Sequence, residues 1–150
     1  MKFIMLSIGF LTIFLSSCSS QDNTSQKVPS VILNTLDTRF PNNTDVDWEK
    51  KGDVYEAKFN DHSKTEITVQ IDELGNLVTQ KQEIAISKLP LTLTSVIKNQ
   101  YKDYKIDGAK KLEKDGKTYY QLELDGKGKI DQKLIFTPEG KEEKGFPFWD

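Results

Sequence analysis

The fold is decided by a stretch that occurs twice, VPSVILNTLDTRFP at residues 28–41 and LPLTLTSVIKNQYK at residues 89–102. Their apolar positions match at a constant offset of 61: Val28, Pro29, Ile32, Leu36 and Phe40 correspond to Leu89, Pro90, Leu93, Ile97 and Tyr101. An apolar residue at every fourth position predicts an amphipathic helix. A proline stands near the start of each helix, where its missing N–H is tolerated. The chain therefore contains an internal repeat, and each copy opens with a helix.

Strands are predicted after each helix. At an offset of 65, further residues match: Tyr55, Ala57, Phe59, Val69, Ile71 and Gly75 correspond to Tyr120, Leu122, Leu124, Leu134, Phe136 and Gly140. Their alternation with polar residues is typical of strands with one buried face. The change of offset places four extra residues of the second copy within Lys102–Tyr119. Further strands are expected around residues 46–50, carrying Trp48, and between residues 106 and 113.

The repeats predict an α+β fold in which each unit is one helix followed by three or four antiparallel strands, separated by turns rich in glycine, aspartate and asparagine. We expect a single domain at residues 28–150. Repeat one spans residues 28–86, repeat two spans residues 87–144, and an aromatic tail follows at residues 145–150.

The first residues predict export and a lipid anchor. An apolar run at residues 3–15 is shorter than the roughly 20 residues of a membrane-spanning helix, and it leads into Leu15-Ser16-Ser17-Cys18. We interpret residues 1–17 as a lipoprotein signal peptide, Cys18 as the lipidated residue, and residues 18–27 as a flexible tether. The alternative is an ordinary signal peptide that leaves Cys18 free. The expected location is the cell envelope, at the outer membrane facing the periplasm or exposed at the surface.

Composition argues against several functions. The net charge of −2 gives no basic excess for nucleic acid. The only histidine, His62, lies in a predicted turn, which excludes catalytic Ser-His-Asp and Cys-His arrangements and a histidine zinc site. There is no glycine-rich phosphate loop. We therefore expect no enzyme, no cofactor and no metal. A carboxylate-dependent hydrolase remains a third alternative, although it would need a deep cleft.

The first copy resembles the PepSY-like repeat of bacterial envelope lipoproteins, a family grouped by fold with secreted β-lactamase inhibitor protein. The matching motifs are Val28-Pro29, Arg39-Phe40-Pro41, Val46-Asp47-Trp48-Glu49, Tyr55-Glu56-Ala57-Lys58-Phe59 and Asp72-Glu73-Leu74-Gly75-Asn76. The second copy lacks the tryptophan and has Tyr101-Lys102 in place of Phe-Pro. The resemblance implies one continuous antiparallel sheet with both helices on one face. It also implies non-catalytic binding or inhibition of another protein.

The expected binding surface is the other face of the sheet, toward which alternate strand residues point. The candidate partner-binding residues on this face and in the tail are Glu56, Lys58, Glu66, Tyr119, Gln121, Glu123, Asp131, Lys133, Phe148 and Trp149. The expected partner is an unidentified envelope or secreted protein. A small ligand or peptide bound to the same face is the second alternative.

One register hypothesis concerns the charges on that face. A three-residue tip at residues 61–63 would set Lys58 opposite Glu66, an exposed ion pair worth about 0.5 kcal/mol. The same register would set Glu123 opposite Asp131, two like charges. With Tyr119 they could form a site for a cation or for a basic group of a partner. The alternative is that both carboxylates point into water.

The aromatic residues raise a choice between core and interface. Trp48, Tyr55 and Tyr120 are expected in the core, because large rings bury much apolar area against a covering helix. The three rings of the tail either fold back over the sheet or meet a partner or a membrane. Packing within the chain is favoured.

Overall fold

The computed structural model describes residues 27–150, so the expected signal peptide, Cys18 and most of the tether lie outside the described residues. Within the described part, the elements follow in the order α1 (Ser30–Arg39), β1 (Thr44–Lys51), β2 (Val54–Asn60), β3 (Glu66–Asp72), β4 (Leu77–Glu83), η1 (Ile86–Lys88), α2 (Leu91–Gln100), β5 (Tyr104–Lys114), β6 (Lys117–Gly126) and β7 (Gln132–Phe136). The short 3₁₀ helix η1 was not expected from the sequence.

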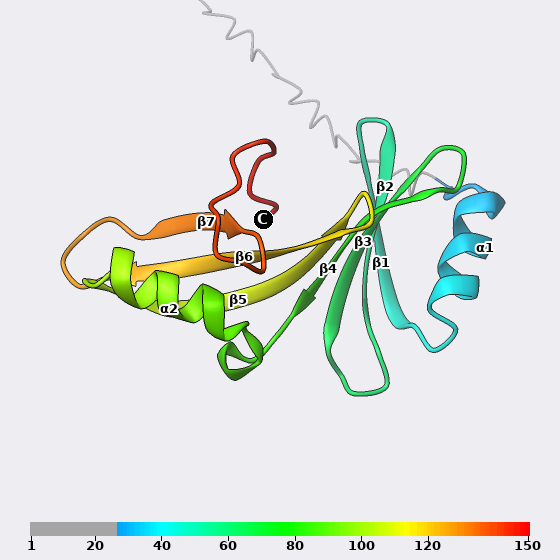
Figure 1. Cartoon of the computed structure of the whole chain (residues 1–150). Coiled ribbons are helices and arrows are strands. Elements are labelled where there is room, and N and C mark those ends of the chain that lie inside the picture. Colours follow the sequence, from blue (N-terminus) through cyan, green and yellow to red (C-terminus); the bar gives the residue numbers. More distant parts are fainter. Residues whose placement is uncertain (1–26) are drawn as a thin grey trace, which may run out of the picture.

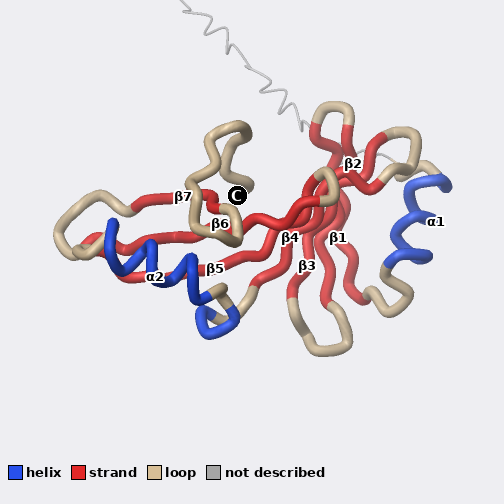
Figure 2. Tube along the Cα trace, viewed as in Figure 1, coloured by secondary structure: helices blue, strands red, loops and turns tan. Residues whose placement is uncertain are grey.

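The seven strands form one antiparallel sheet in which they lie side by side in chain order (Figure 1). Repeat one supplies four strands and repeat two supplies three, and Glu142 adds a single bridge to Phe136 beside β7. The sheet is strongly twisted, and α1 and α2 lie over different halves of it (Figure 2). The predicted fold, one continuous antiparallel sheet with helices on one face, is confirmed. No helix in the described part is long and apolar enough to cross a membrane.

Each helix buries its apolar stripe against the strands of its own repeat. Ile32 and Leu36 of α1 belong to a buried cluster with Phe59 and Val69. Leu93 and Ile97 of α2 belong to a second buried cluster. Its strand residues are Ala109, Leu122, Leu124 and Phe136, and Leu134 packs against them. Two hydrophobic cores therefore lie along one sheet, as the two helical stripes predict.

The expected core aromatics lie on the helix side of the sheet. Tyr55 is buried in the first cluster, and Trp48 packs half-buried against the same cluster. Tyr120 is half-buried against the second cluster. These three positions agree with the sequence-based expectation.

The four extra residues of the second copy lengthen the β5–β6 hairpin. In repeat one, Lys50 pairs with Tyr55 and one more pair precedes the turn. In repeat two, the equivalent pair is Lys111 with Tyr120, and three more pairs precede the turn. The insertion is thus two additional residue pairs, within the stretch that the change of offset indicated.

The register hypothesis for the exposed charges was wrong. Lys58 lies opposite Thr68, because the β2–β3 loop contains five residues instead of three. Asp61 closes this loop by accepting hydrogen bonds from the N–H groups of Ser63 and Thr65 at 2.8 and 2.9 Å. Lys58 still reaches Glu66 diagonally, at 2.8 Å.

In the second repeat, Glu123 lies opposite Lys133. Asp131 precedes β7, and its carboxylate accepts a hydrogen bond from the N–H of Gly126 at 3.1 Å. The two like charges expected to face each other therefore do not, and Glu123 has lysines as neighbours. This arrangement removes the basis for a cation site built from Glu123, Asp131 and Tyr119.

Candidate functional site

The candidate site is the face of the sheet opposite the helices, called the open face below. Its central row of paired residues runs across six strands: Asp47, Lys58, Thr68, Lys81, Leu112 and Tyr119. The next row across the last four strands contains Glu83, Lys110, Gln121 and Ile135. Polar and charged residues predominate. Several of them are buried, which indicates that another part of the chain covers this face.

The tail, residues 145–150, folds back from the end of repeat two (Figure 1), and its contacts with Glu56, Lys81 and Tyr119 place it on the open face. Phe146 packs edge-on against Tyr119, with ring centroids 5.0 Å apart. The indole N–H of Trp149 donates to the Oε2 of Glu56 at 2.8 Å. Asp150 is ion-paired with Lys133. The tail therefore folds back on its own chain, which agrees with the alternative that the sequence favoured.

Lys81 is the main cationic contact of the tail. Its ammonium donates to the backbone oxygens of Trp149 and Asp150 at 2.9 and 3.1 Å and lies 4.4 Å from the centroid of the Trp149 ring. The side chain is buried, with 7% of the residue exposed. Burial, together with the nearby charge of Lys110, lowers the pKa of Lys81 to about 8.

Glu56 is the matching anionic contact. Burial alone would raise its pKa, but hydrogen bonds from Lys51, Gln70 and Trp149 outweigh burial and lower it. The distances from Lys51 and Gln70 to the carboxylate are 2.8 and 3.1 Å. Glu56 is therefore a charged acceptor fixed beneath the tail.

Gln121 is buried on the same face without compensation. It is 1% exposed, and within the described residues neither its Oε1 nor its Nε2 has a hydrogen-bond partner. Tyr119 and Glu123 flank it on β6, and Ile135 lies opposite it on β7. A buried, unpaired amide costs about 1–3 kcal/mol, so this position of the open face is buried at a cost in stability.

The structure places the sequence-predicted residues in three environments. Lys58, Glu66, Asp131 and Lys133 are exposed. Tyr119, Glu123, Phe148 and Trp149 are half-buried, and Glu56 and Gln121 are buried. All but Asp131 belong to the open face or to the tail on it. Sequence reasoning missed Lys81, because it assigned no alternation to residues 77–83; in β4, Lys81 and Glu83 lie on the open face.

A charged hollow of about 260 Å³ lies beside the tail on the open face. Its charged lining residues alternate in sign and comprise Glu56, Lys58, Glu66, Lys81, Glu83, Lys110 and Asp150. Lys110 also reaches the carboxylate of Glu123 at 3.4 Å. No group of histidine, cysteine, aspartate and glutamate residues in the described part has the arrangement of a metal site.

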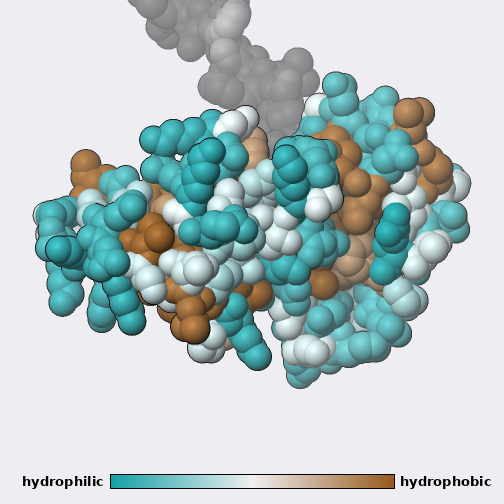
Figure 3. Space-filling model, viewed as in Figure 1, coloured by the Kyte–Doolittle hydropathy of each residue, from teal (hydrophilic) through white to brown (hydrophobic). Residues whose placement is uncertain are grey.

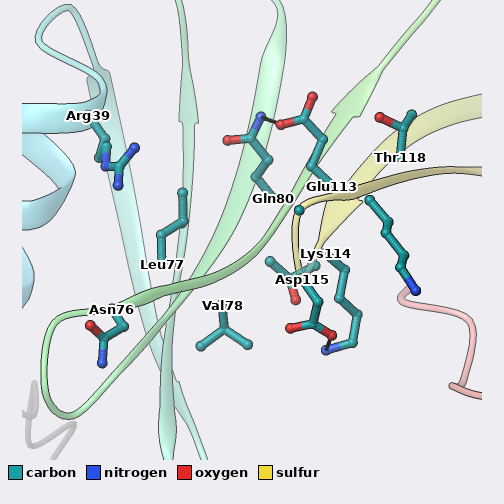
Figure 4. Close-up of a pocket in the computed structure, with 12 residues that line it drawn as sticks. Arg39, Asn76, Leu77, Val78, Gln80, Glu113, Lys114, Asp115 and Thr118 are labelled. Carbon is teal, nitrogen blue, oxygen red and sulfur yellow. Dashed lines mark hydrogen bonds and ion pairs between the residues drawn. The ribbon is translucent and has the colours of Figure 1, made fainter.

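A larger pocket, of about 690 Å³, lies away from the open face, between the end of α1, β4 and the tip of the β5–β6 hairpin (Figure 4). Arg39 approaches it from α1, and Gln80 and Glu113 are joined by a hydrogen bond of 3.0 Å on its wall. Its carboxylates, Glu113 and Asp115, are each ion-paired with a lysine, at 2.6 and 3.7 Å. They do not form the facing carboxylate pair of a hydrolase.

The rest of the surface is mostly hydrophilic in the view of Figure 3, where hydrophobic residues form separate groups. The most exposed large apolar side chains, Leu74, Leu91 and Ile130, belong to different turns and ends of the molecule. Isolated apolar residues of this kind are normal on a soluble surface. The open face is therefore the more informative surface for function.

The repeats and the single sheet with its open face define an α+β protein built from two helix-and-strand units. A family model described as "putative beta-lactamase-inhibitor-like, PepSY-like" matches residues 15–79 and again residues 77–142. The chain therefore belongs to the PepSY-like family and contains two of its repeats, as the sequence predicted. No curated protein sequence matches the chain.

Three solved structures share the fold. A BLIP-like protein from Bacteroides fragilis is 22% identical with a TM-score of 0.68, over 82% of this chain and 89% of that one. A DUF2874 family protein from Bacteroides uniformis is 16% identical with a TM-score of 0.72, over 79% and 88%. A Bacteroides eggerthii structure described as "putative periplasmic proteins" is 12% identical with a TM-score of 0.72, over 79% and 87%. At these identities the similarity establishes the fold alone.

Proposed function

We propose that this protein is a non-catalytic lipoprotein of the cell envelope that binds or inhibits another protein through its open sheet face. The observation that carries the proposal is the exposed, charge-alternating surface of that face beside the tail. The family's inhibitor-like description and the BLIP-like neighbour support a binding role.

The dimensions of the open face suit a protein partner. Seven strands spaced about 4.8 Å apart make a sheet about 30 Å wide, and a stable interface needs roughly 800 Å² from each partner. Lys58 and Glu66 line the hollow. They form an ion pair in which both side chains are about half exposed. Such exposed charges act mainly on specificity and association rate.

The proposed location is the outer membrane, with Cys18 as the lipid anchor and residues 18–27 as the tether. The lipoprotein signal at Leu15-Ser16-Ser17-Cys18 supports this assignment. The description of the Bacteroides eggerthii neighbour agrees with an envelope location. The fully extended tether would hold the domain at most about 30 Å from the membrane, so a partner would have to come close to the membrane.

The experiment is site-specific photo-crosslinking in intact cells, followed by mass spectrometry. A photoreactive residue at Lys58 probes the open face, and the same residue at the exposed Thr38 of α1 is the matched control. We expect a discrete crosslinked protein from position 58 only, with a lower yield when Cys18→Ser removes the anchor. The same products from both positions, or none from position 58, would contradict the proposal.

Small-ligand binding is the second candidate function, and the pocket of about 690 Å³ favours it because small-molecule sites have volumes of roughly 300–1,000 Å³. This pocket lies on the helix side of the sheet, whereas the sequence placed the alternative on the open face. A ligand that shifts the NMR signals of Arg39 and Thr118, but leaves crosslinking from position 58 unchanged, would assign ligand binding to this pocket.

A further inference from the structure

The tail is attached to the open face in the manner of a bound peptide. It makes no strand pairing with the sheet, and Pro147 removes one of its backbone donors. Its contacts are the ring of Phe146, the indole N–H of Trp149, two backbone oxygens and the carboxylate of Asp150. These contacts form a short series along a segment without regular secondary structure, which can dissociate without opening the sheet.

The contacts of the tail join groups that are distant in sequence. Trp149 donates to Glu56 of β2, 93 positions away, and accepts from Lys81 of β4 through its backbone oxygen. Lys133 of β7 lies 5.3 Å from the Phe148 ring centroid and pairs with Asp150. One anionic acceptor and two cationic donors, spread over three strands, thus recognise a segment of only five residues.

The fit between the tail and the face is incomplete. An open pocket of about 230 Å³ lies beside the tail, lined by Gln70, Thr79, Leu112 and Lys114 together with residues 146–149. Gln121 is buried, and within the described residues neither the oxygen nor the nitrogen of its side-chain amide is paired. A buried, unpartnered amide and an open pocket beside the tail both mark a surface that a different occupant could fill better.

We propose that the open face contains a peptide-binding site for a segment rich in aromatic residues and ending in an acidic residue, and that residues 146–150 occupy this site within the chain. A partner of this chemistry displaces the tail by supplying its own ring and N–H donor to Glu56, backbone oxygens to Lys81 and an acidic group to Lys133. This inference rests on the proposed function, since it names the segment of the partner that is recognised.

The charges around Asp150 disfavour a basic residue at the last position of a ligand segment. Lys81, Lys110 and Lys133 surround the positions where the backbone oxygens and the carboxylate of the tail lie. A basic residue in place of Asp150 would add a fourth positive charge to this group. The stacking of Lys81 on an indole ring further favours an aromatic residue next to the acidic one.

The test is binding of a synthetic peptide, GFPFWD, corresponding to residues 145–150, measured by calorimetry. Three receptors are compared in detergent: the full chain, the full chain with Trp149→Ala, and a chain ending at Lys144. We expect the full chain to bind at least tenfold more weakly than the chain ending at Lys144, because its own tail competes. The Trp149→Ala chain should lie between them.

Two substitutions in the Trp149→Ala chain identify the site. Lys81→Met should weaken peptide binding at least tenfold, whereas Lys105→Met, at an exposed lysine of β5 beside α2, should leave it unchanged. A peptide with Trp149→Ala should bind poorly to every receptor. Equal peptide affinities for the wild-type and Trp149→Ala chains, or no saturable binding to the latter, would overturn the inference.

If the chain ending at Lys144 does not fold, the peptide affinities of the wild-type and Trp149→Ala chains alone test the inference. The result also separates this inference from the proposed function. Crosslinking from position 58 without peptide binding would keep the proposed function and reject the peptide site. Peptide binding without any crosslinked protein would keep the peptide site and reject the protein partner.

Discussion

At the scale of single residues, a glycine in each repeat sets how closely its helix approaches the sheet. Gly75 and Gly140, at the last turn of the two repeats, both have φ of +87°. A Cβ added at Gly75 would lie 2.7 Å from the Cγ2 of Val31, and one at Gly140 would lie 2.7 Å from the Cγ2 of Val96. The repeat therefore preserves a turn–helix contact that any side chain would disrupt.

We predict that Gly75→Ala lowers the free energy of unfolding by about 2–4 kcal/mol, measured by urea denaturation. The left-handed backbone costs alanine about 1 kcal/mol, and the clash with Val31 adds about 1–3 kcal/mol. Gly52→Ala is the control, because Gly52 has φ of +61° but no atom within 4 Å of an added Cβ. It should cost only about 1 kcal/mol. Equal losses of stability in the two variants would show that the contact between α1 and the turn at Gly75 does not add to the cost of the substitution.

Lys81 gives a pH-dependent prediction. Its pKa falls from 10.5 to about 8 on folding, chiefly through burial, so between these values the unfolded chain binds more protons than the folded chain. The free energy of unfolding contributed by Lys81 therefore rises with pH from about 8 to 10.5. Relative to the Lys81→Met variant, the wild type should gain on the order of 1 kcal/mol across this range. A constant difference between the two proteins from pH 7 to 10.5 would contradict the shift.

At the scale of elements, the helices were predictable because their apolar stripes are short-range patterns. Loop lengths were not predictable, because the β2–β3 loop is closed by hydrogen bonds from backbone N–H groups to a side chain, which strand alternation does not indicate. Asp61 accepts two backbone N–H groups, and Lys64 adopts φ of 57°. Nothing in the alternation of the strands distinguishes this five-residue loop from a shorter one. Because the same register was assumed in both repeats, the predicted partners of Lys58 and Glu123 were each wrong by two residues.

The stripe of α2 gives a prediction with an internal control. Leu93 is fully buried, whereas Leu91, two residues earlier in the same helix, is 84% exposed. Leu93→Ala should lower the free energy of unfolding by about 3 kcal/mol, since it leaves a cavity in the second core. Leu91→Ala should change it by less than about 0.5 kcal/mol. Thermal and urea denaturation of the two variants provide the measurement, and comparable losses would be inconsistent with the packing of α2.

At the scale of the whole molecule, the two cores are connected by the pairing of β4 with β5 and by the tail. Thr79–Glu83 pair with Lys110–Lys114, and the two buried clusters otherwise lie under separate helices. The tail follows the strands of repeat two but reaches Glu56 in repeat one. The sequence indicates that the aromatic rings of the tail need to be buried. It does not indicate the surface that buries them, because Lys81 and Glu56 come together only in the assembled sheet.

Removing the tail should therefore reduce the cooperativity between the two repeats. A chain ending at Lys144 retains Trp48 as its only tryptophan, and Trp48 packs against the first core. Its fluorescence then reports unfolding of repeat one, while far-ultraviolet circular dichroism reports both repeats. Because the shortened chain keeps only the β4–β5 pairing between the cores, we expect the two urea transitions to separate, whereas those of the full chain coincide. Coincident transitions in the shortened chain would show that the strand pairing alone couples the repeats and that the tail is only a bound segment.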